Sequence, residues 1–291
     1  MRGLLTGSRF FQIAEVWKNF RKNKLAVIGL VIIVVLILCG IFAPAITPAG
    51  YEEIKYLEEI NGFPSFRHLF GVDAVGRDYF SRVIYGIRIS FLVGFSTAIM
   101  ALFIGVPLGA VAGYIGGAVD WWVLRLVETF SNIPPLLLAI LFVTTFGSGL
   151  QNVIIILSLV GWMDICRLVR GQILGLKERE YAMAARAIGV KRYRILFRHL
   201  VPNAIAPIIV GMVLGVPRAI MMEAMLSFLG IGVNPPIPSW GQMISEGLYY
   251  VQFYWHLTLF PAVFLALTVL SLSFVGDGLR DAMDPKLRGR R

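Results

Sequence analysis

The sequence has 291 residues, of which 57% are hydrophobic and only 15% are charged, and its formal net charge is +10. This balance is too apolar for an ordinary soluble protein and indicates a chain whose main solvent is lipid. The lysines and arginines alternate with long apolar runs and form no continuous basic face, which argues against a nucleic-acid partner and favours a membrane surface. Cys39 and Cys166 stand far apart without companion cysteines, so neither a disulfide nor a zinc site is expected.

The chain begins with a basic segment, residues 1–24, which is followed by an uncharged apolar run. The run from Leu25 to Pro44 is longer than the core of a secretory signal and has no cleavage pattern close behind it, so we expect an uncleaved first span. A membrane-crossing helix needs roughly 20 mostly apolar residues, and in lipid it must satisfy its own backbone hydrogen bonds. The sequence therefore predicts an all-α integral membrane protein with six transmembrane helices, at about 25–46, 89–114, 125–147, 150–170, 204–229 and 256–276.

Lysine and arginine are concentrated in three segments: the start of the chain, the stretch from Arg167 to Arg198, and the end of the chain. Because cytoplasmic loops are enriched in basic residues, we expect these segments, and with them both termini, in the cytoplasm. The first loop carries charges of both signs and is placed outside by parity. The predicted organisation is a cytoplasmic segment (1–24), a first helix (25–46), an extracytoplasmic loop (47–88), a core of five helices (89–276) that includes a cytoplasmic loop (178–203), and a cytoplasmic tail (277–291).

The predicted second span carries Gly105, Gly109 and Gly113 at every fourth position, which places them on one helix face. Another helix can approach closely there. Packing within this chain is the favoured explanation, and a seam with a second subunit is the alternative. Pro107 in this span and the Pro134–Pro135 pair in the next one predict kinks, because proline removes a backbone donor.

The basic loop between the fourth and fifth spans contains two short helical patterns. In each, apolar side chains recur at i, i+3, i+4 and i+7, which places them on one helical stripe. Gly189 provides a stop between the two, and Pro202 follows the second. Such a pair of amphipathic helices either lies in the lipid headgroup layer or docks a partner protein. The stripes consist of Tyr181, Ala184, Ala185 and Ile188 in the first helix and of Tyr193, Leu196, Phe197 and Leu200 in the second.

Two ionisable residues, Arg218 and Glu223, fall within the predicted fifth span. A charge near mid-membrane costs about 2.5–3.5 kcal/mol on insertion scales, so each needs a partner or a wet cavity. They are roughly 140° apart around a helix and do not easily neutralise each other. Lining of a transport pathway and structural pairing both stay open for them. Two further pairs at i,i+3 are expected to be structural: Arg125 with Glu128, and Asp164 with Arg167.

The positions of Ala184, Ala185, Gly189 and Pro202 resemble the EAA loop of permeases of ATP-binding-cassette (ABC) importers. Three other segments, 70–86, 223–241 and 276–285, resemble motifs of the C-type permeases of dipeptide, oligopeptide and nickel importers, and the likeness extends over almost the whole chain. The order and spacing of these motifs make the resemblance specific. One departure is Met183, which stands where the loop motif has glutamate and puts one charged contact in doubt.

The resemblance implies a type I ABC importer permease bundle in the bacterial inner membrane, without a catalytic residue, metal or cofactor of its own. It implies a homologous second permease in a heterodimer, two ATPase subunits that hold ATP and Mg²⁺, and an extracytoplasmic substrate-binding protein. The expected cargo is a dipeptide or oligopeptide, with nickel or another small solute as the alternative. Arg218 and Glu223 are the candidates for lining the pathway. Coupling to the ATPase is expected of Tyr181, Met183, Ala184, Ala185, Ile188, Gly189 and Pro202.

Two other classes of membrane protein fit the sequence less well. An enzyme would need a nucleophile, metal or acid–base motif, yet the three histidines are scattered and neither an HExxH motif nor a Gly-rich phosphate-binding loop is present. A secondary transporter buries ion-coupling carboxylates near the midplane and often contains an internal repeat. The acids in the predicted spans are few and no convincing repeat is found. Whether uptake follows ATP or an ion gradient separates this class from an ABC importer.

Overall fold

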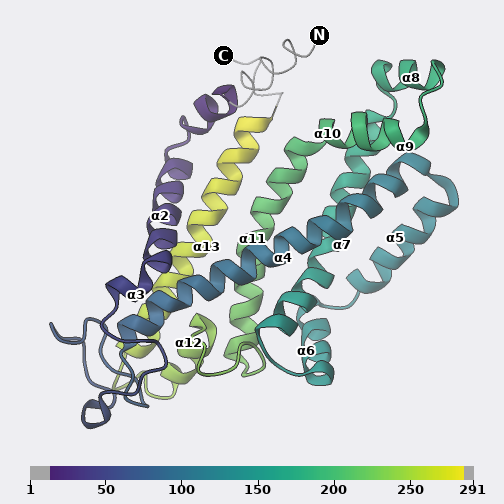
Figure 1. The fold of residues 1–291 in the computed structure, drawn as a ribbon. Helices are drawn as coiled ribbons and strands as arrows, with labels where there is room; N and C mark the ends of the chain where they lie inside the picture. Colours follow the sequence, from purple (N-terminus) through teal and green to yellow (C-terminus); the bar gives the residue numbers. More distant parts are fainter. Residues whose placement is uncertain (1–13, 285–291) are drawn as a thin grey trace.

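The computed structural model describes residues 14–284, which are mostly helical and contain no named β-strand, as the sequence predicts (Figure 1). Five helices are long and apolar enough to cross a membrane. They are α2 (Lys24–Ile41), α4 (Tyr79–Ile115), α7 (Leu150–Leu176), α11 (Ile205–Phe228) and α13 (His256–Met283). The shorter helices are α3 (Ala43–Ile46), η1 (Leu57–Glu59), α5 (Gly117–Ser131), α6 (Pro135–Phe146), α8 (Glu180–Ala187), α9 (Arg192–Ile195), η2 (Leu196–Leu200), α10 (Val201–Asn203) and α12 (Trp240–Leu248).

The predicted third span, 125–147, is wrong as a single helix. The chain instead forms α5 and α6, which are bent by 83° relative to each other. Pro134 lies between them in an extended conformation, with φ −52° and ψ 129°. The ring of a proline pushes the preceding residue out of the helical region, so Pro135 forces this break at Pro134. The kink predicted from these two prolines is therefore confirmed.

Helices α5 and α6 together still carry the chain across the bundle. In the first turn of α5, Asp120 accepts a hydrogen bond from Arg170, near the end of α7, at 2.6 Å. After α6, Ser148 donates a hydrogen bond of 2.7 Å to Asn234, in the loop that leads to α12. The start of α5 and the end of α6 lie toward opposite ends of the bundle (Figure 1). If the bent pair is one broken span, as these contacts indicate, it and the five long helices make up the six crossings that the sequence predicts.

Four predicted boundaries differ from the structure. Helix α4 begins at Tyr79 rather than at 89, because the Asp78 carboxylate caps it by accepting a hydrogen bond of 2.8 Å from the Ser81 N–H. The first span, 25–46, is divided into α2 and α3 just before Pro44. Helices α7 and α13 continue past the predicted ends at 170 and 276. As a result, Asp164, which lies close to the end of the predicted span 150–170, is near the middle of α7.

The glycine face of α4 packs against α7 within this chain. A Cβ atom at Gly105, Gly109 or Gly113 would lie less than 3.0 Å from a backbone oxygen of α7. The favoured explanation, packing inside one subunit, is confirmed for these three glycines. This contact positions α4 and α7 around a shared core that includes Cys166 and Val169.

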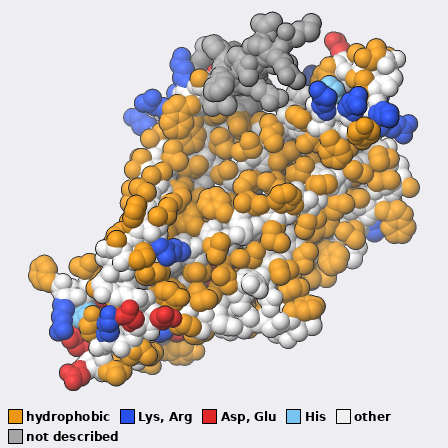
Figure 2. Space-filling view, viewed as in Figure 1, with side chains coloured by type: hydrophobic (Ala, Val, Ile, Leu, Met, Phe, Trp, Pro, Cys, Tyr) orange, Lys and Arg blue, Asp and Glu red, His pale blue; other side chains and the backbone are white. Residues whose placement is uncertain are grey.

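The long helices lie side by side in one bundle. Helix α2 packs against α13, α11 packs against both α13 and α4, and α4 runs obliquely across the bundle to reach α7 (Figure 1). Apolar side chains cover most of the face seen in Figure 2, and charged side chains gather mainly toward its two ends. This is the distribution expected of a chain whose middle is surrounded by lipid.

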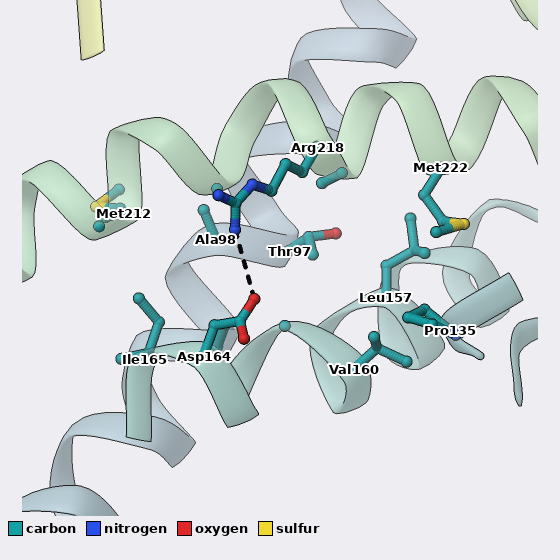
Figure 3. A pocket seen from close by; sticks show the side chains of 15 residues that line it. Thr97, Ala98, Pro135, Leu157, Val160, Asp164, Ile165, Met212, Arg218 and Met222 are labelled. Carbon is teal, nitrogen blue, oxygen red and sulfur yellow. Dashed lines mark hydrogen bonds and ion pairs between the residues drawn. The ribbon is translucent and has the colours of Figure 1, made fainter. Parts of the chain in front are cut away.

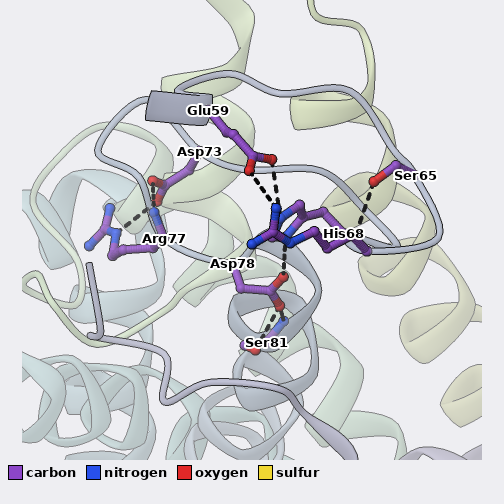
Figure 4. A network of polar contacts seen from close by, with 8 residues as sticks. Glu59, Ser65, His68, Asp73, Arg77, Asp78 and Ser81 are labelled. Carbon is purple, nitrogen blue, oxygen red and sulfur yellow. Dashed lines mark hydrogen bonds and ion pairs between the residues drawn. The ribbon is translucent and has the colours of Figure 1, made fainter. Parts of the chain in front are cut away.

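The segment between α3 and α4 is held by buried charges at one end of the bundle (Figure 4). Asp73 is buried and accepts hydrogen bonds from Arg77 and Arg82, both at 2.7 Å. His68 is buried beside Asp78, with 3.5 Å between Nδ1 and Oδ1. Since Asp78 also caps α4, the cluster that closes this loop fixes the start of α4.

Candidate functional site

The predicted pair of short helices joins α7 to α11 at one end of the bundle (Figure 1). Helix α8 ends in two hydrogen bonds that define a Schellman motif. The Gly189 N–H donates to the Arg186 carbonyl at 3.0 Å, and the Val190 N–H donates to the Ala185 carbonyl at 3.1 Å. Gly189 has φ +79°, a left-handed conformation that glycine adopts without a steric penalty. The predicted glycine stop is therefore confirmed.

Helix α8 turns most of its apolar side chains away from the bundle. Ala182, which the predicted stripe does not include, is the one residue of α8 that is buried. Its small side chain packs into the core cluster shared by α4 and α7. Tyr181 and Met183 are exposed, and Ile188 just after the helix is 80% exposed. Exposed apolar side chains that are grouped in this way are typical of a surface that another molecule covers.

The predicted stripe of the second helix is only partly correct. Helix α9 is one turn long and continues into η2, a π-helical turn. Its wider turn changes the rotation per residue, and this breaks the spacing of an α-helix. Leu196 and Leu200 are buried, as the stripe predicts, and Ile195 is buried with them. Tyr193 and Phe197 are instead exposed.

We use the name docking face for the exposed apolar side chains of this unit, which lie on more than one side of α8: Tyr181, Met183, Ile188, Tyr193 and Phe197. Exposed basic side chains lie in the same unit, and Figure 2 shows Lys and Arg atoms beside apolar ones at this end of the molecule. These are Lys191, Arg192, Arg194 and Arg198. The face therefore offers a partner both apolar contact area and positive charge.

The docking face is fixed to the membrane-spanning helices. The Lys177 ammonium, just after α7, donates a hydrogen bond of 3.0 Å to the Gly113 carbonyl near the end of α4. Arg186 of α8 donates to the Lys177 carbonyl. At the other side, α10, with Pro202 in its first turn, leads into α11. The docking face is therefore connected to α4, α7 and α11 by hydrogen bonds and by the chain itself.

A cavity of about 190 Å³ lies in the bundle, lined chiefly by α4, α7 and α11 (Figure 3). Its walls are mostly small or apolar, and they carry two charged side chains, Asp164 of α7 and Arg218 of α11. The Arg218 Nη1 lies 3.5 Å from the Asp164 Oδ2. The other carboxylate oxygen of Asp164 lies 3.5 Å from Arg167 Nη1. The cavity therefore has a charged wall in an otherwise apolar lining.

Both charged side chains stand near the midpoint of their helices, where the membrane centre is expected. Within this chain, 74% of the Arg218 side chain and 65% of the Asp164 side chain are exposed. Facing lipid there would cost about 2.5–3.5 kcal/mol for each charge. This side of the bundle is therefore expected to face water or protein. Arg218 lines this cavity, and its place in a transport pathway stays a prediction. Asp164, which the sequence predicts only as a partner of Arg167, lines the cavity too.

Glu223, the other candidate for the pathway, is not among the residues that line the cavity. Its side chain is 1% exposed and accepts hydrogen bonds from Ser227 and Ser239, both at 2.7 Å. Ser239 directly precedes α12. Glu223 thus ties α11 to α12, and this contact favours structural pairing over pathway lining.

The other predicted charge pairs are present. Arg167 lies 3.5 Å from Asp164, and Arg125 lies 3.7 Å from Glu128. Within residues 14–284, no group of three or more His, Cys, Asp or Glu side chains is arranged to hold a metal ion.

Two families of known sequences match this chain. Residues 105–289 match the family described as binding-protein-dependent transport system inner membrane component, and residues 12–64 match the N-terminal transmembrane domain of oligopeptide transport permease C. The oligopeptide transport system permease protein OppC of Bacillus subtilis is 45% identical over 279 residues, which cover 94% of this chain and 91% of that protein. The dipeptide transport system permease protein DppC of Alkalihalophilus pseudofirmus is 43% identical over 274 residues, with coverages of 94% and 90%.

Among solved structures, the fold is similar to a chain of the MetNI methionine ABC transporter in an inward-facing conformation. The TM-score is 0.57 at 20% identity, and the match covers 70% of this chain and 97% of that one. This likeness supports the fold of a type I ABC importer permease. On the strength of the sequence matches and the apolar helices, the chain belongs to the family of binding-protein-dependent transport system inner membrane components, the permeases of ABC importers, and is a multi-pass protein of the inner membrane.

Proposed function

We propose that this chain is one of two homologous permease subunits of an ABC importer that carries dipeptides or oligopeptides across the bacterial inner membrane. Family membership and the similarity to proteins named for oligopeptide and dipeptide transport support this cargo. The observation that carries the proposal is the docking face, an exposed apolar surface anchored to three membrane-spanning helices. Nickel or another small solute is the alternative cargo.

The energy is supplied from outside this chain. Because the sequence has no Gly-rich phosphate-binding loop, ATP and Mg²⁺ are held by two separate ATPase subunits. One of them binds the docking face, where Met183 offers an apolar contact in place of the glutamate of related loops. Closure of the two ATPases pushes α8 and η2, and this moves α4, α7 and α11 as a unit. Relative to the second permease, this movement opens the cavity to the outer side, where a substrate-binding protein delivers the cargo.

The complete importer in proteoliposomes, with both permeases, both ATPases and the binding protein, tests this function. We expect peptide uptake that requires ATP and continues when an uncoupler removes the ion gradients. Uptake of Ni²⁺ without peptide uptake would establish the alternative cargo. Loss of uptake on adding the uncoupler, with ATP held constant, would identify a secondary transporter instead.

The same preparation tests the docking face through Ile188→Asp. A charge at the centre of a protein contact typically costs enough to weaken it at least about tenfold, so we expect most of the ATPase to be lost on purification. Leu57→Asp is the matched control, because Leu57 is a similarly exposed apolar residue at the other end of the molecule. If Ile188→Asp retains the ATPase as well as the control does, the helix pair lies in the headgroup layer and the docking assignment is wrong.

A further inference from the structure

Arg218, on the charged wall of the cavity, has more N–H donors than its contacts within residues 14–284 use. A guanidinium has five N–H donors and grips a carboxylate best through two parallel hydrogen bonds of roughly 2.7–2.9 Å. Arg218 makes only one contact with Asp164, at 3.5 Å. Within residues 14–284 it has no other ion-pair partner, and most of its side chain is exposed at the cavity. Arg218 is therefore free to accept a second carboxylate.

Asp164 can leave Arg218 without losing all of its partners. Its second oxygen already lies 3.5 Å from Arg167, one turn further along α7. Arg167 is itself held in place, because its guanidinium donates to the Ser131 hydroxyl at the end of α5. A small shift of the Asp164 side chain toward Arg167 releases Arg218 while the aspartate stays paired.

The charge of this cluster selects the ligand. Arg167, Asp164 and Arg218 sum to one positive charge, so the wall attracts an anionic group more than a cation. The neighbouring walls at Ala98, Gly161 and Gly215 are small and carry no charge, and they leave room for a peptide backbone of varied sequence.

We propose that Arg218 binds the terminal carboxylate of a peptide as it passes through the cavity, and that Asp164 occupies the guanidinium when no cargo is present. The cargo carboxylate replaces the Asp164 carboxylate at Arg218, and Asp164 moves onto Arg167. This assignment rests on the proposed peptide cargo and adds the group by which the permease itself recognises it.

The test compares one peptide in two forms, with a free C-terminal carboxylate and with a C-terminal amide, in the complete importer. Each form of the peptide is supplied bound to the binding protein, at a saturating concentration of that complex. Uptake by each variant is compared with uptake by the wild type for the same peptide, so the selectivity of the binding protein does not affect the comparison. In Arg218→Gln we expect uptake of the free acid to fall about tenfold or more, because the variant loses a charge-assisted hydrogen bond to the carboxylate. Uptake of the amide should not change. Arg218→Lys, which keeps the charge but not the two-pronged geometry, should recover part of the free-acid uptake.

Arg125→Gln is the matched control, since Arg125 is an exposed arginine that also pairs with one acid but does not line the cavity. It should leave both forms unchanged. An equal fall for acid and amide in Arg218→Gln, or no fall for either, would overturn the proposal. If Arg218→Gln does not assemble, Arg218→Lys is used instead. A ratio of free-acid uptake to amide uptake equal to that of the wild type would then overturn the proposal. Absence of uptake of both forms by the wild type would instead show that the proposed cargo is wrong.

A second variant tests the role of Asp164. Asp164→Asn removes the internal carboxylate that competes with the cargo, so the KM for the free acid should fall several-fold and the KM for the amide should not. A structural role for Asp164 alone predicts equal changes for both forms, and that result would contradict the exchange of partners.

Discussion

Gly109 of α4 lies against the backbone carbonyl of Cys166 in α7, and a Cβ atom at this position would come closer than 3.0 Å to the oxygen. Gly105 and Gly113 meet backbone carbonyls of α7 one turn to either side. Because the opposing atoms belong to the backbone, they cannot move aside as a flexible side chain would. The spacing of the glycines predicts this contact face from the sequence alone. It does not predict which helix fills the face, since a row of glycines carries no information about its partner.

Gly109→Ala should therefore destabilise the bundle. Overpacking of this kind typically costs about 1–3 kcal/mol, since the two backbones must separate. Gly171→Ala in α7 is the matched control, because no atom lies within 4 Å of its Cβ position. Alanine there should be neutral or slightly stabilising, by up to about 1 kcal/mol, through its better helix propensity. The midpoint of thermal unfolding in detergent measures both, and equal midpoints for the two variants would show that α4 and α7 do not pack closely at Gly109.

At the scale of elements, the sequence predicts the five long helices and the pair of short helices between α7 and α11, misses α12, and misplaces several helix ends. The missed start of α4 depends on the cap at Asp78. Helix α7 continues for six residues beyond Arg170, which pairs with Asp120, 50 positions earlier in the chain. The π-helical turn of η2, in which Leu196 and Leu200 are buried in the core, is a second feature that the α-helical spacing does not predict. Local patterns predict an element well, whereas its limits depend on contacts made by distant residues.

The turn between α8 and α9 gives a prediction at this scale. Gly189 has φ +79°, and open space surrounds its Cβ position, so a side chain there meets a conformational barrier and no clash. Gly189→Val should cost about 1–2 kcal/mol and redirect α9, because a β-branched residue resists the left-handed conformation. Gly189→Asn is the matched control, since asparagine tolerates this conformation.

The readout is the ATP hydrolysis that loaded binding protein stimulates in the complete importer. We expect Gly189→Val to lose most of the stimulation and Gly189→Asn to keep most of it. Equal stimulation in the two variants would mean that the angle between α8 and α9 does not matter for coupling.

At the scale of the whole molecule, the broken span α5–α6 decides how many times the chain crosses the membrane. Hydropathy predicts six crossings and does not show that the third is bent by 83°. The contacts of Asp120 and Ser148 place the two ends of the bent pair at opposite ends of the bundle. The direction of insertion stays a prediction from the distribution of lysine and arginine, because the fold is the same in either direction.

Cysteine labelling tests both the crossing and the direction. In a background with Cys39→Ala and Cys166→Ala, a membrane-impermeant thiol reagent should label Glu58→Cys and Ser148→Cys in intact cells, where the membrane shields the cytoplasmic side. Arg192→Cys should react only after permeabilisation, since its loop carries the basic excess of a cytoplasmic segment. All three positions are exposed within this chain, so a difference in labelling does not come from burial inside it, and labelling of Arg192→Cys after permeabilisation shows that the ATPase does not cover that position. If Ser148→Cys behaves like Arg192→Cys, the pair α5–α6 enters and leaves on one side, and the six-crossing arrangement is wrong. If Glu58→Cys and Arg192→Cys exchange their behaviour, the bundle is inserted in the opposite direction, and the docking face cannot meet an ATPase that uses cytoplasmic ATP.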